Sequence, residues 1–229
     1  MISRTPLPLR RLVVALGGLP LFLQAPRAVA QAPVDTPAPA DSGRFVVLHR
    51  RDTVVVERFS RAGELLQGEL VRVVPRRDRE NYRAVMAPDA SLPLVEVAVR
   101  RGDNPPTAPP VQRTRVIFKD DSVAVDDVTS NGLATRIFPS EAGAIPYLNL
   151  SFALLEQATR RAAASGRDSL EVPFFNLGGG QTLRGRVIRL APDRMRLVIG
   201  SVAFDLRVGQ AGRILGGGIA EQELTVERQ

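Results

Sequence analysis

The chain has 229 residues, a formal net charge of +7, one histidine, and neither cysteine nor tryptophan. The lack of cysteine excludes a disulfide framework, a thiolate zinc site, a thiol nucleophile and a lipid-anchored cysteine. A single histidine excludes a multi-histidine metal centre, and we expect neither a metal nor a cofactor. Hydrophobic residues make up 44% of the chain and the mean hydropathy is -0.02, so it can fold around an apolar core.

The first thirty residues have the organisation of a secretory signal peptide. Residues 1–11 contain three arginines and no acid, residues 12–23 are apolar, and Ala28-Val-Ala30 forms a small-residue cleavage pattern. The apolar run is too short and too broken for a transmembrane helix, which needs about 20 residues. We therefore predict a periplasmic or secreted protein that is cleaved near Ala30 and has no transmembrane anchor. The adjacent Arg10 and Arg11 leave Sec and twin-arginine export both open.

Cleavage would remove four arginines and no acid, and would lower the formal charge from +7 to +3. Aromatic residues make up only 5% of the chain, so few rings are available to stack on bases, and we expect no nucleic-acid partner. Residues 31–43 are rich in proline and alanine and predict a linker. Residues 44–229 then form a β-rich domain, either undivided or split into two sub-sheets near residues 148–165.

Short runs of alternating apolar and polar residues dominate this domain. They are separated by turn residues roughly every eight to twelve positions, which is typical of antiparallel strands. Residues 45–48 and 53–59 predict a hairpin around His49–Asp52. The other predicted strands are 65–74, 82–86, 94–99, 114–119, 122–125, 170–175, 183–190, 195–199, 202–208 and 224–227.

The alternation also assigns faces to the strands. In residues 202–208, Phe204 and Leu206 share one face, while Asp205 and Arg207 share the other. Such a pattern is typical of a sheet that buries one face and exposes the other to water.

One segment, residues 148–165, has helical instead of strand periodicity. Asn149 or Ser151 is placed to cap its start, and Gly166 is placed to end it. Its apolar face contains Leu150, Leu154, Leu155, Ala158 and Ala162, and its polar face contains Glu156, Gln157, Arg160 and Arg161. We predict a mainly β fold, a curved antiparallel sheet or half-barrel with this one amphipathic helix packed on it.

The sequence gives little support for catalysis. No G-x-S-x-G or S-x-x-K motif occurs. His49 with Asp52 and a distant serine would make a hydrolase triad, but both residues also suit an exposed hairpin tip. The acidic pairs Asp120-Asp121 and Asp126-Asp127 flank a predicted strand and lack the spacing of a calcium loop. We assign no catalytic residue and no metal ligand.

Two glycine runs, at residues 178–180 and 216–218, lack the strand-and-helix context of a phosphate loop. We interpret both runs as turns or bulges.

Five arginines fall on the predicted outer faces of neighbouring strands. This stripe would suit anionic lipid headgroups, lipopolysaccharide or another polyanion. It would equally suit a simple solvated face. The five residues are Arg184, Arg186, Arg194, Arg196 and Arg207.

The domain begins with Gly43-Arg-Phe-Val-Val-Leu-His49, continues with Asp52-Thr-Val-Val-Val-Glu-Arg58, and has a turn at Gly63 followed by Gly68. This opening resembles secreted bacterial β-domains without assigned function, and the half-barrel envelope proteins that include lipoprotein carriers. The resemblance implies a curved sheet that wraps a helix and shelters an acyl chain.

The predicted function is therefore a non-enzymatic envelope protein that binds a lipid or other apolar ligand, or that docks on an envelope partner. A secreted hydrolase and a structural accessory β-module are the alternatives. The residues that would line a concave apolar site, unless they only fill the core, are Val97, Phe118, Leu197, Phe204 and Leu206.

Overall fold

The computed structural model describes residues 41–229, except 74–76, 103 and 106. The predicted signal peptide and most of the predicted linker lie outside the described residues. Strand β1 (Asp41–His49) starts inside the expected linker, so Asp41, Ser42 and Gly43 belong to the sheet. No helix in the described ranges is long and apolar enough to cross a membrane.

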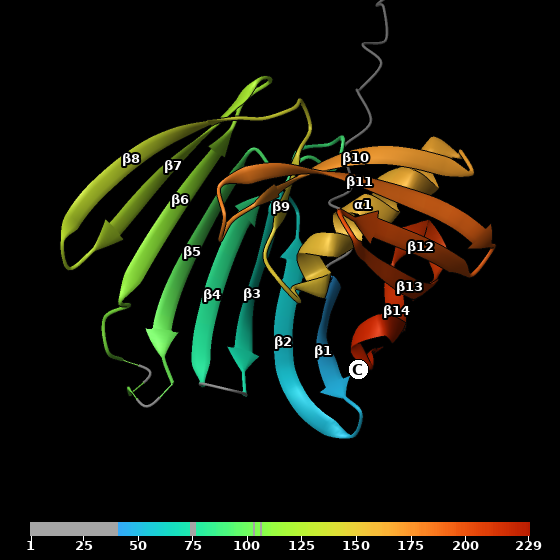
Figure 1. The fold of residues 1–229 in the computed structure, drawn as a ribbon, viewed down its shortest axis with the longest axis horizontal. Helices are drawn as coiled ribbons and strands as arrows, with labels where there is room; N and C mark the ends of the chain where they lie inside the picture. The colour runs from blue at the N-terminus through green and yellow to red at the C-terminus, as the bar shows by residue number, and fades with distance from the viewer. Residues whose placement is uncertain (1–40, 74–76, 103, 106) are drawn as a thin grey trace, which may run out of the picture. The chain divides into compact units, whose positions relative to one another are not determined.

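The described strands form one fifteen-stranded sheet, in the order β8-β7-β6-β5-β4-β3-β2-β1-β15-β14-β13-β12-β11-β10-β9 (Figure 1). Neighbouring strands are antiparallel, except for the parallel pair β9–β10. The remaining strands are β2 (Asp52–Ala62), β3 (Leu65–Arg72), β4 (Asp78–Val85), β5 (Leu94–Arg101), β6 (Gln112–Phe118), β7 (Ser122–Thr129), β8 (Gly132–Pro139), β9 (Ile145–Tyr147), β10 (Ser169–Asn176), β11 (Gln181–Ala191), β12 (Arg194–Ile199), β13 (Val202–Val208), β14 (Ile214–Ile219) and β15 (Leu224–Arg228).

The predicted fold class is confirmed: the domain is a large, open, curved sheet with one α-helix in the described part of the chain, and it is not closed into a barrel. The first and last strands, β1 and β15, pair in the middle of the sheet and join its two halves. Helix α1 (Phe152–Ser165) lies inside the curve (Figure 1). It follows β9 along the chain and does not divide the sheet.

The predicted strand faces are also confirmed. Phe204 and Leu206 of β13 are buried against the helix side, while Asp205 and Arg207 are exposed on the outer, convex face. This alternation follows from the two-residue period of a strand, which sends successive side chains to opposite faces.

Helix α1 begins at Phe152, four residues later than predicted, and ends before Gly166, whose φ of 65° is the left-handed conformation that favours glycine. The helix is buried on more sides than the sequence predicts. Glu156 and Gln157, which we expected on a solvated face, are buried because residues of β2, β14 and β15 cover that side.

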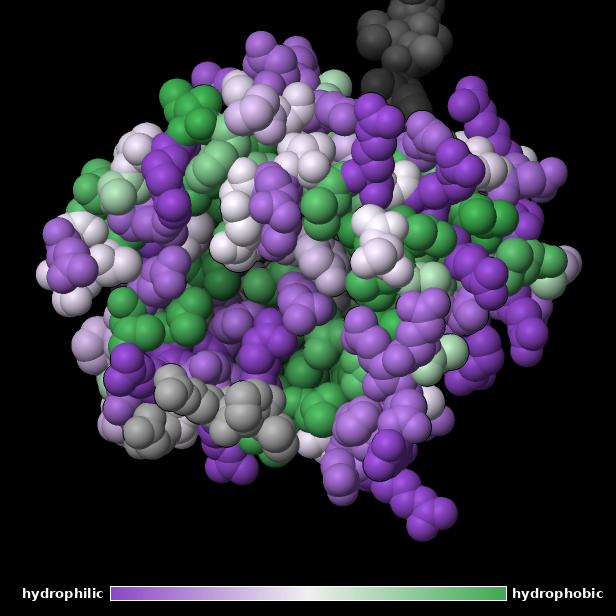
Figure 2. Space-filling model, viewed as in Figure 1, coloured by the Kyte–Doolittle hydropathy of each residue, from purple (hydrophilic) through white to green (hydrophobic). Residues whose placement is uncertain are grey.

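The concave side of the sheet is packed with side chains. Phe152 of α1 contacts the rings of Phe45 and Phe204, at centroid distances of 5.7 and 6.2 Å. A second apolar cluster lies beneath β6 and β7 and includes Val116, Val123, Val125, Ala144 and Phe175. In the view of Figure 2, polar residues are interspersed over the surface and apolar residues are visible in the central recess.

Three strands are missing from the sequence interpretation: β8, β9 and β14. Strand β8 is an edge strand with apolar residues on both faces, so it shows no clean alternation. Strand β14 contains residues 216–218, the glycine run that we interpreted as a turn or bulge. That interpretation is wrong for this run and confirmed for Gly178–Gly180, which forms the turn between β10 and β11.

Candidate functional site

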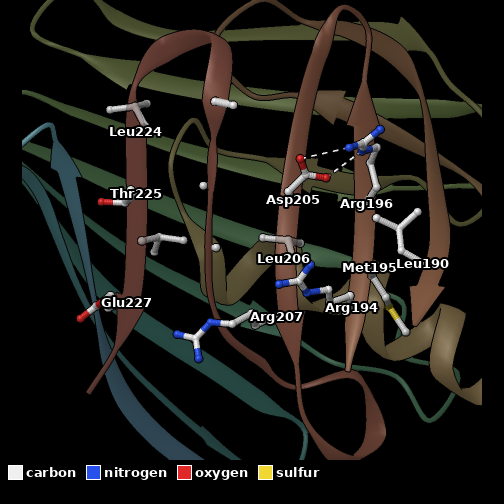
Figure 3. A pocket seen from close by; sticks show the side chains of 14 residues that line it. Leu190, Arg194, Met195, Arg196, Asp205, Leu206, Arg207, Leu224, Thr225 and Glu227 are labelled. Atoms are coloured by element: carbon white, nitrogen blue, oxygen red, sulfur yellow. Dashed lines mark hydrogen bonds and ion pairs between the residues drawn. The ribbon is translucent and has the colours of Figure 1, made fainter. Parts of the chain in front are cut away.

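A groove of about 540 Å³ runs across the outer face of β11–β15 (Figure 3). The outer face is the exposed side of the sheet, opposite helix α1. The residues that line this outer groove are Leu190, Arg194, Met195, Arg196, Asp205, Leu206, Arg207, Gly217, Gly218, Ala220, Leu224, Thr225, Val226 and Glu227.

Glycines create the hollow. In the strand register, Gly216 lies opposite Arg207 and Glu227, and Gly218 lies opposite Asp205 and Thr225. Residues directly opposite one another point to the same face of a sheet, so the two glycines leave bare backbone where outward side chains would stand. A Cβ on Gly216 would lie 2.8 Å from Nη2 of Arg207, which shows that this guanidinium extends over the glycine floor.

The charges in the groove are unequally paired. Arg196 donates two hydrogen bonds to the carboxylate of Asp205, at 2.7 and 3.1 Å. The hydrogen bond from Arg196 to Asp205 raises the pKa of this arginine. Arg194 and Arg207 lie directly opposite each other on β12 and β13, and within the described residues neither forms an ion pair. Like charges in direct cross-strand register destabilise a sheet, so an anion bound between them would stabilise it.

The groove also has an apolar side. Leu190 is 51% exposed at one wall (Figure 3), whereas Leu224 at the other end is half-buried and packs against the core. Isolated exposed leucines need no explanation. Beside an unpaired arginine pair, however, Leu190 gives the site an apolar part next to its cationic part.

All five arginines of the predicted stripe are exposed on the outer face of β11, β12 and β13. The structure divides them into two groups. Arg186 and Arg196 already have carboxylate partners, Glu171 and Asp205, each at 2.7 Å. Arg194 and Arg207 line the outer groove, and Arg184 lies outside it on β11.

The residues predicted to line a concave apolar site have their side chains in the packed interior, although Leu206 also borders the outer groove. Val97, Leu197, Phe204 and Leu206 belong to the buried core, and Phe118 is half-buried at its margin. Their role in ligand binding stays a prediction.

His49 and Asp52 do face each other across the β1–β2 hairpin. His49 Nε2 lies 3.7 Å from a carboxylate oxygen of Glu223. Within the described part of the chain, no hydrogen bond joins His49 to a serine, so the geometry does not assemble a triad.

Of the two acidic pairs, Asp120-Asp121 precedes β7, whereas Asp126-Asp127 lies within it, because the strand runs four residues beyond the predicted end at residue 125. Asp126 accepts a hydrogen bond from Thr135 on the outer face, and Asp127 accepts one from Thr114 on the inner face. Burial favours a higher pKa for Asp127, but hydrogen bonds from Thr114, Gln112 and Arg136 outweigh it and lower the pKa. Among the described residues, no group of three or more potential ligands from histidine, cysteine, aspartate and glutamate is placed to hold a metal ion.

Sequence reasoning missed a fully buried carboxylate, Glu57 of β2. Its Oε1 accepts hydrogen bonds from Tyr82 Oη at 2.7 Å and Ser151 Oγ at 2.5 Å, and its Oε2 accepts one from the Ala153 amide at 3.0 Å. Glu57 thereby caps the start of α1, where free amides need an acceptor. Burial raises its pKa, against the opposing effect of these hydrogen bonds.

A second missed cluster surrounds Glu156, which is also fully buried. Its carboxylate accepts hydrogen bonds from Arg61, Arg160, Arg228 and the Ile214 amide, each at 2.8 Å. Asp41 pairs with the same three arginines and with Arg213.

The strand pattern contained the signal for part of this arrangement. Every second residue of β2 points to the same face, and these residues are Val55, Glu57, Phe59 and Arg61. The two charged residues therefore share the apolar face. A charged residue on a buried face needs a partner.

The sequence matches no protein-family model and no curated protein. The fold is similar to the crystal structure of a DUF1089 family protein from Pseudomonas aeruginosa. The TM-score is 0.53, with 14% sequence identity over 73% of this chain and 91% of that one. A beta-barrel-like protein of domain of unknown function DUF1849 from Brucella abortus gives a TM-score of 0.48, with 8% identity over 83% of this chain and 94% of that one. The first likeness supports the fold class alone.

Proposed function

We propose that this protein is an exported, non-enzymatic binding module that takes an anionic amphiphile, such as an acidic lipid, in the outer groove. One observation carries the proposal: Arg194 and Arg207 lie opposite each other in the strand register without a carboxylate partner in the described residues, beside a glycine floor and the exposed Leu190. Export to the periplasm or the medium rests on the predicted signal peptide.

The chemistry of the groove favours a lipid-like anion over other anions. The two guanidinium groups suit a phosphate or carboxylate headgroup, because arginine presents several N–H donors in a planar fork. Leu190 would contact the beginning of an acyl chain. The groove is lined by no aromatic side chain that could stack on a nucleic-acid base.

The outer groove, and not the concave face of the sheet, is the site that we propose. The concave face is occupied by α1 and by the packed phenylalanines around it. The outer groove, at about 540 Å³, falls within the roughly 300–1,000 Å³ that is usual for small-molecule sites.

The test uses the chain from Gln31 and vesicles of phosphatidylcholine with or without phosphatidylglycerol. We expect binding only to the acidic vesicles, and a roughly thirtyfold loss in a double Arg194→Gln and Arg207→Gln variant. That loss corresponds to about 1 kcal/mol for each arginine near an anionic surface. The matched control is Arg186→Gln, because Arg186 is exposed on the same face but already pairs with Glu171.

Equal binding to both vesicle types, no binding at all, or an equal loss in the Arg186→Gln control would each refute the proposal. Native mass spectrometry after lipid extraction of the purified chain then identifies the ligand class. An acidic lipid that stays bound to the wild type and not to the double variant supports the outer groove as the site.

A second candidate function, docking through the sheet edge, rests on a separate observation. Strand β8 is a free edge, and Val128, Leu133 and Ile137 are 47%, 67% and 73% exposed on the outer face beside it. A long apolar edge strand is a template for pairing with another strand. We propose a second copy of this chain as the occupant, because β8 contains a single charged residue, Arg136, and so has little charge to repel its own copy.

Light scattering after size exclusion tests this candidate. We expect a wild-type dimer at about 100 μM that Leu133→Lys converts to a monomer, because edge lysines oppose strand pairing. A matched Leu190→Lys variant, also on the outer face, should remain dimeric. A monomeric wild type would refute the edge pairing.

A further inference from the structure

A smaller pocket, of about 230 Å³, lies between α1 and the loops at one end of the sheet. We call it the helix-side pocket. It is separate from the outer groove, because the two share no lining residue. Its lining residues are Arg61, Gly63, Glu64, Met86, Ala87, Pro88, Ala90, Gln157 and Arg160.

Two residues that line this pocket each have a buried donor atom without a hydrogen-bond partner among the described residues. The Nε2 atom of Gln157 makes no hydrogen bond, although this residue is only 1% exposed. The Nε atom of Arg61 is also without a partner, while its two terminal nitrogens bind Asp41, Glu156 and the Ala153 carbonyl. An unpaired buried donor costs about 1–3 kcal/mol, so native proteins nearly always give it an acceptor.

The charge around the pocket indicates which acceptor fits. Arg61 and Arg160 belong to the cluster around Glu156 and Asp41, which joins four arginines to two carboxylates. The cluster therefore has an excess of positive charge. Burial lowers the pKa of Arg61, as expected for a cation short of solvent, and its carboxylate partners oppose that effect. An anion in the helix-side pocket would reduce the excess.

We propose that the helix-side pocket binds a small oxyanion, a carboxylate or a phosphate group. Both donor atoms are closed off from solvent, so the two side chains would turn toward the pocket on binding. One oxygen would then accept from Gln157 Nε2 and another from Arg61 Nε, with the guanidinium of Arg160 beside them. The volume suits a small anion or one anionic headgroup and excludes a folded partner.

Calorimetric titration tests the proposal, with sodium phosphate and sodium acetate as probes against sodium chloride at equal ionic strength. We expect phosphate, acetate or both to bind where chloride does not. Gln157→Leu, which keeps the side-chain volume and removes the donor, should weaken that binding about tenfold, as for the loss of a hydrogen bond to a charged group. The control is Gln222→Leu, because Gln222 is exposed and lies outside the pocket.

A second variant guards against misfolding of Gln157→Leu. Glu64 is an exposed residue at the pocket rim, so Glu64→Gln should fold normally and strengthen anion binding about twofold by removing a nearby like charge. No binding of either anion, or a crystal structure with phosphate and acetate that shows only water at Gln157 Nε2, would overturn the proposal. So would equal affinity in Gln157→Leu and the wild type. A negative result in this experiment would not bear on the proposed function of the outer groove, because Arg194 and Arg207 do not line the helix-side pocket.

Discussion

Replacing Glu57 with leucine would remove the acceptor that joins β2 to the start of α1. In the wild type this carboxylate is fully buried and accepts hydrogen bonds from Tyr82, Ser151 and the Ala153 amide. Leucine has a similar size and no acceptor, so three buried donors would lose their partner together. A glutamine at the same position would keep an oxygen for the Ala153 amide, and its amide group can donate to the two hydroxyls once they rotate.

The structure sets the size of the effect. Each buried donor left without a partner costs about 1–3 kcal/mol, and three donors at about 1.3 kcal/mol each, near the low end of that range, cost about 4 kcal/mol. The buried leucine methyl groups return about 1 kcal/mol of apolar burial. We therefore expect Glu57→Leu to lower the free energy of unfolding by about 3 kcal/mol, and Glu57→Gln to lower it by less than about 1 kcal/mol.

Urea unfolding at pH 7, followed by far-ultraviolet circular dichroism, measures both variants. The control is Glu96→Leu on the exposed outer face of β5, which should stay within about 0.5 kcal/mol of the wild type. A Glu57→Leu variant as stable as the control would refute the capping role. So would a Glu57→Gln variant that is destabilised as much as Glu57→Leu.

Three further predictions concern the same interior. Because burial raises the pKa of Glu57 above the ordinary glutamate value of 4.5, the folded state holds this proton to higher pH than the unfolded state. The stability advantage of the wild type over Glu57→Gln should therefore be greatest below pH 4.5 and decline as the pH rises, as urea titrations at several pH values would show. Glu156→Leu leaves buried guanidinium groups without their carboxylate and should lower the free energy of unfolding by about 4 kcal/mol in the same assay. A loss below about 1 kcal/mol would contradict the role of this cluster. Gly212→Ala places a Cβ against the Thr159 carbonyl at a φ of 75° and should cost at least about 2 kcal/mol in thermal unfolding, whereas Gly200→Ala, with a φ of 57° and open space, should cost about 1 kcal/mol.

The fold class could be read from the sequence because strand and helix periods are local. The alternation of Phe204 and Leu206 with Asp205 and Arg207 placed one face inside and one outside, and Gly166 marked the end of the helix. The start of the helix could not be read in this way, because its cap is a glutamate ninety-four residues from Ser151. No sequence pattern near Ser151 identifies Glu57 as the partner.

The candidate site was predictable only in part. The sequence placed the arginines on one face, and the structure decided which of them have partners. Cross-strand register gives Arg196 a carboxylate and sets Arg194 against Arg207. The hollow beside Arg207 depends on Gly216 and Gly218 of β14, which looked like part of a turn because glycine carries no side-chain periodicity.

The sequence by itself determined the composition limits, the predicted export signal, the strand and helix periods, and the outward placement of the arginines. Each of these depends on residues close together in the chain. Only the tertiary structure decided that the concave side is filled, that Glu57 and Glu156 are buried among donors, and that Gln157 and Arg61 share a pocket. These features depend on residues that are far apart in the chain and are brought together only when the sheet curves around the helix.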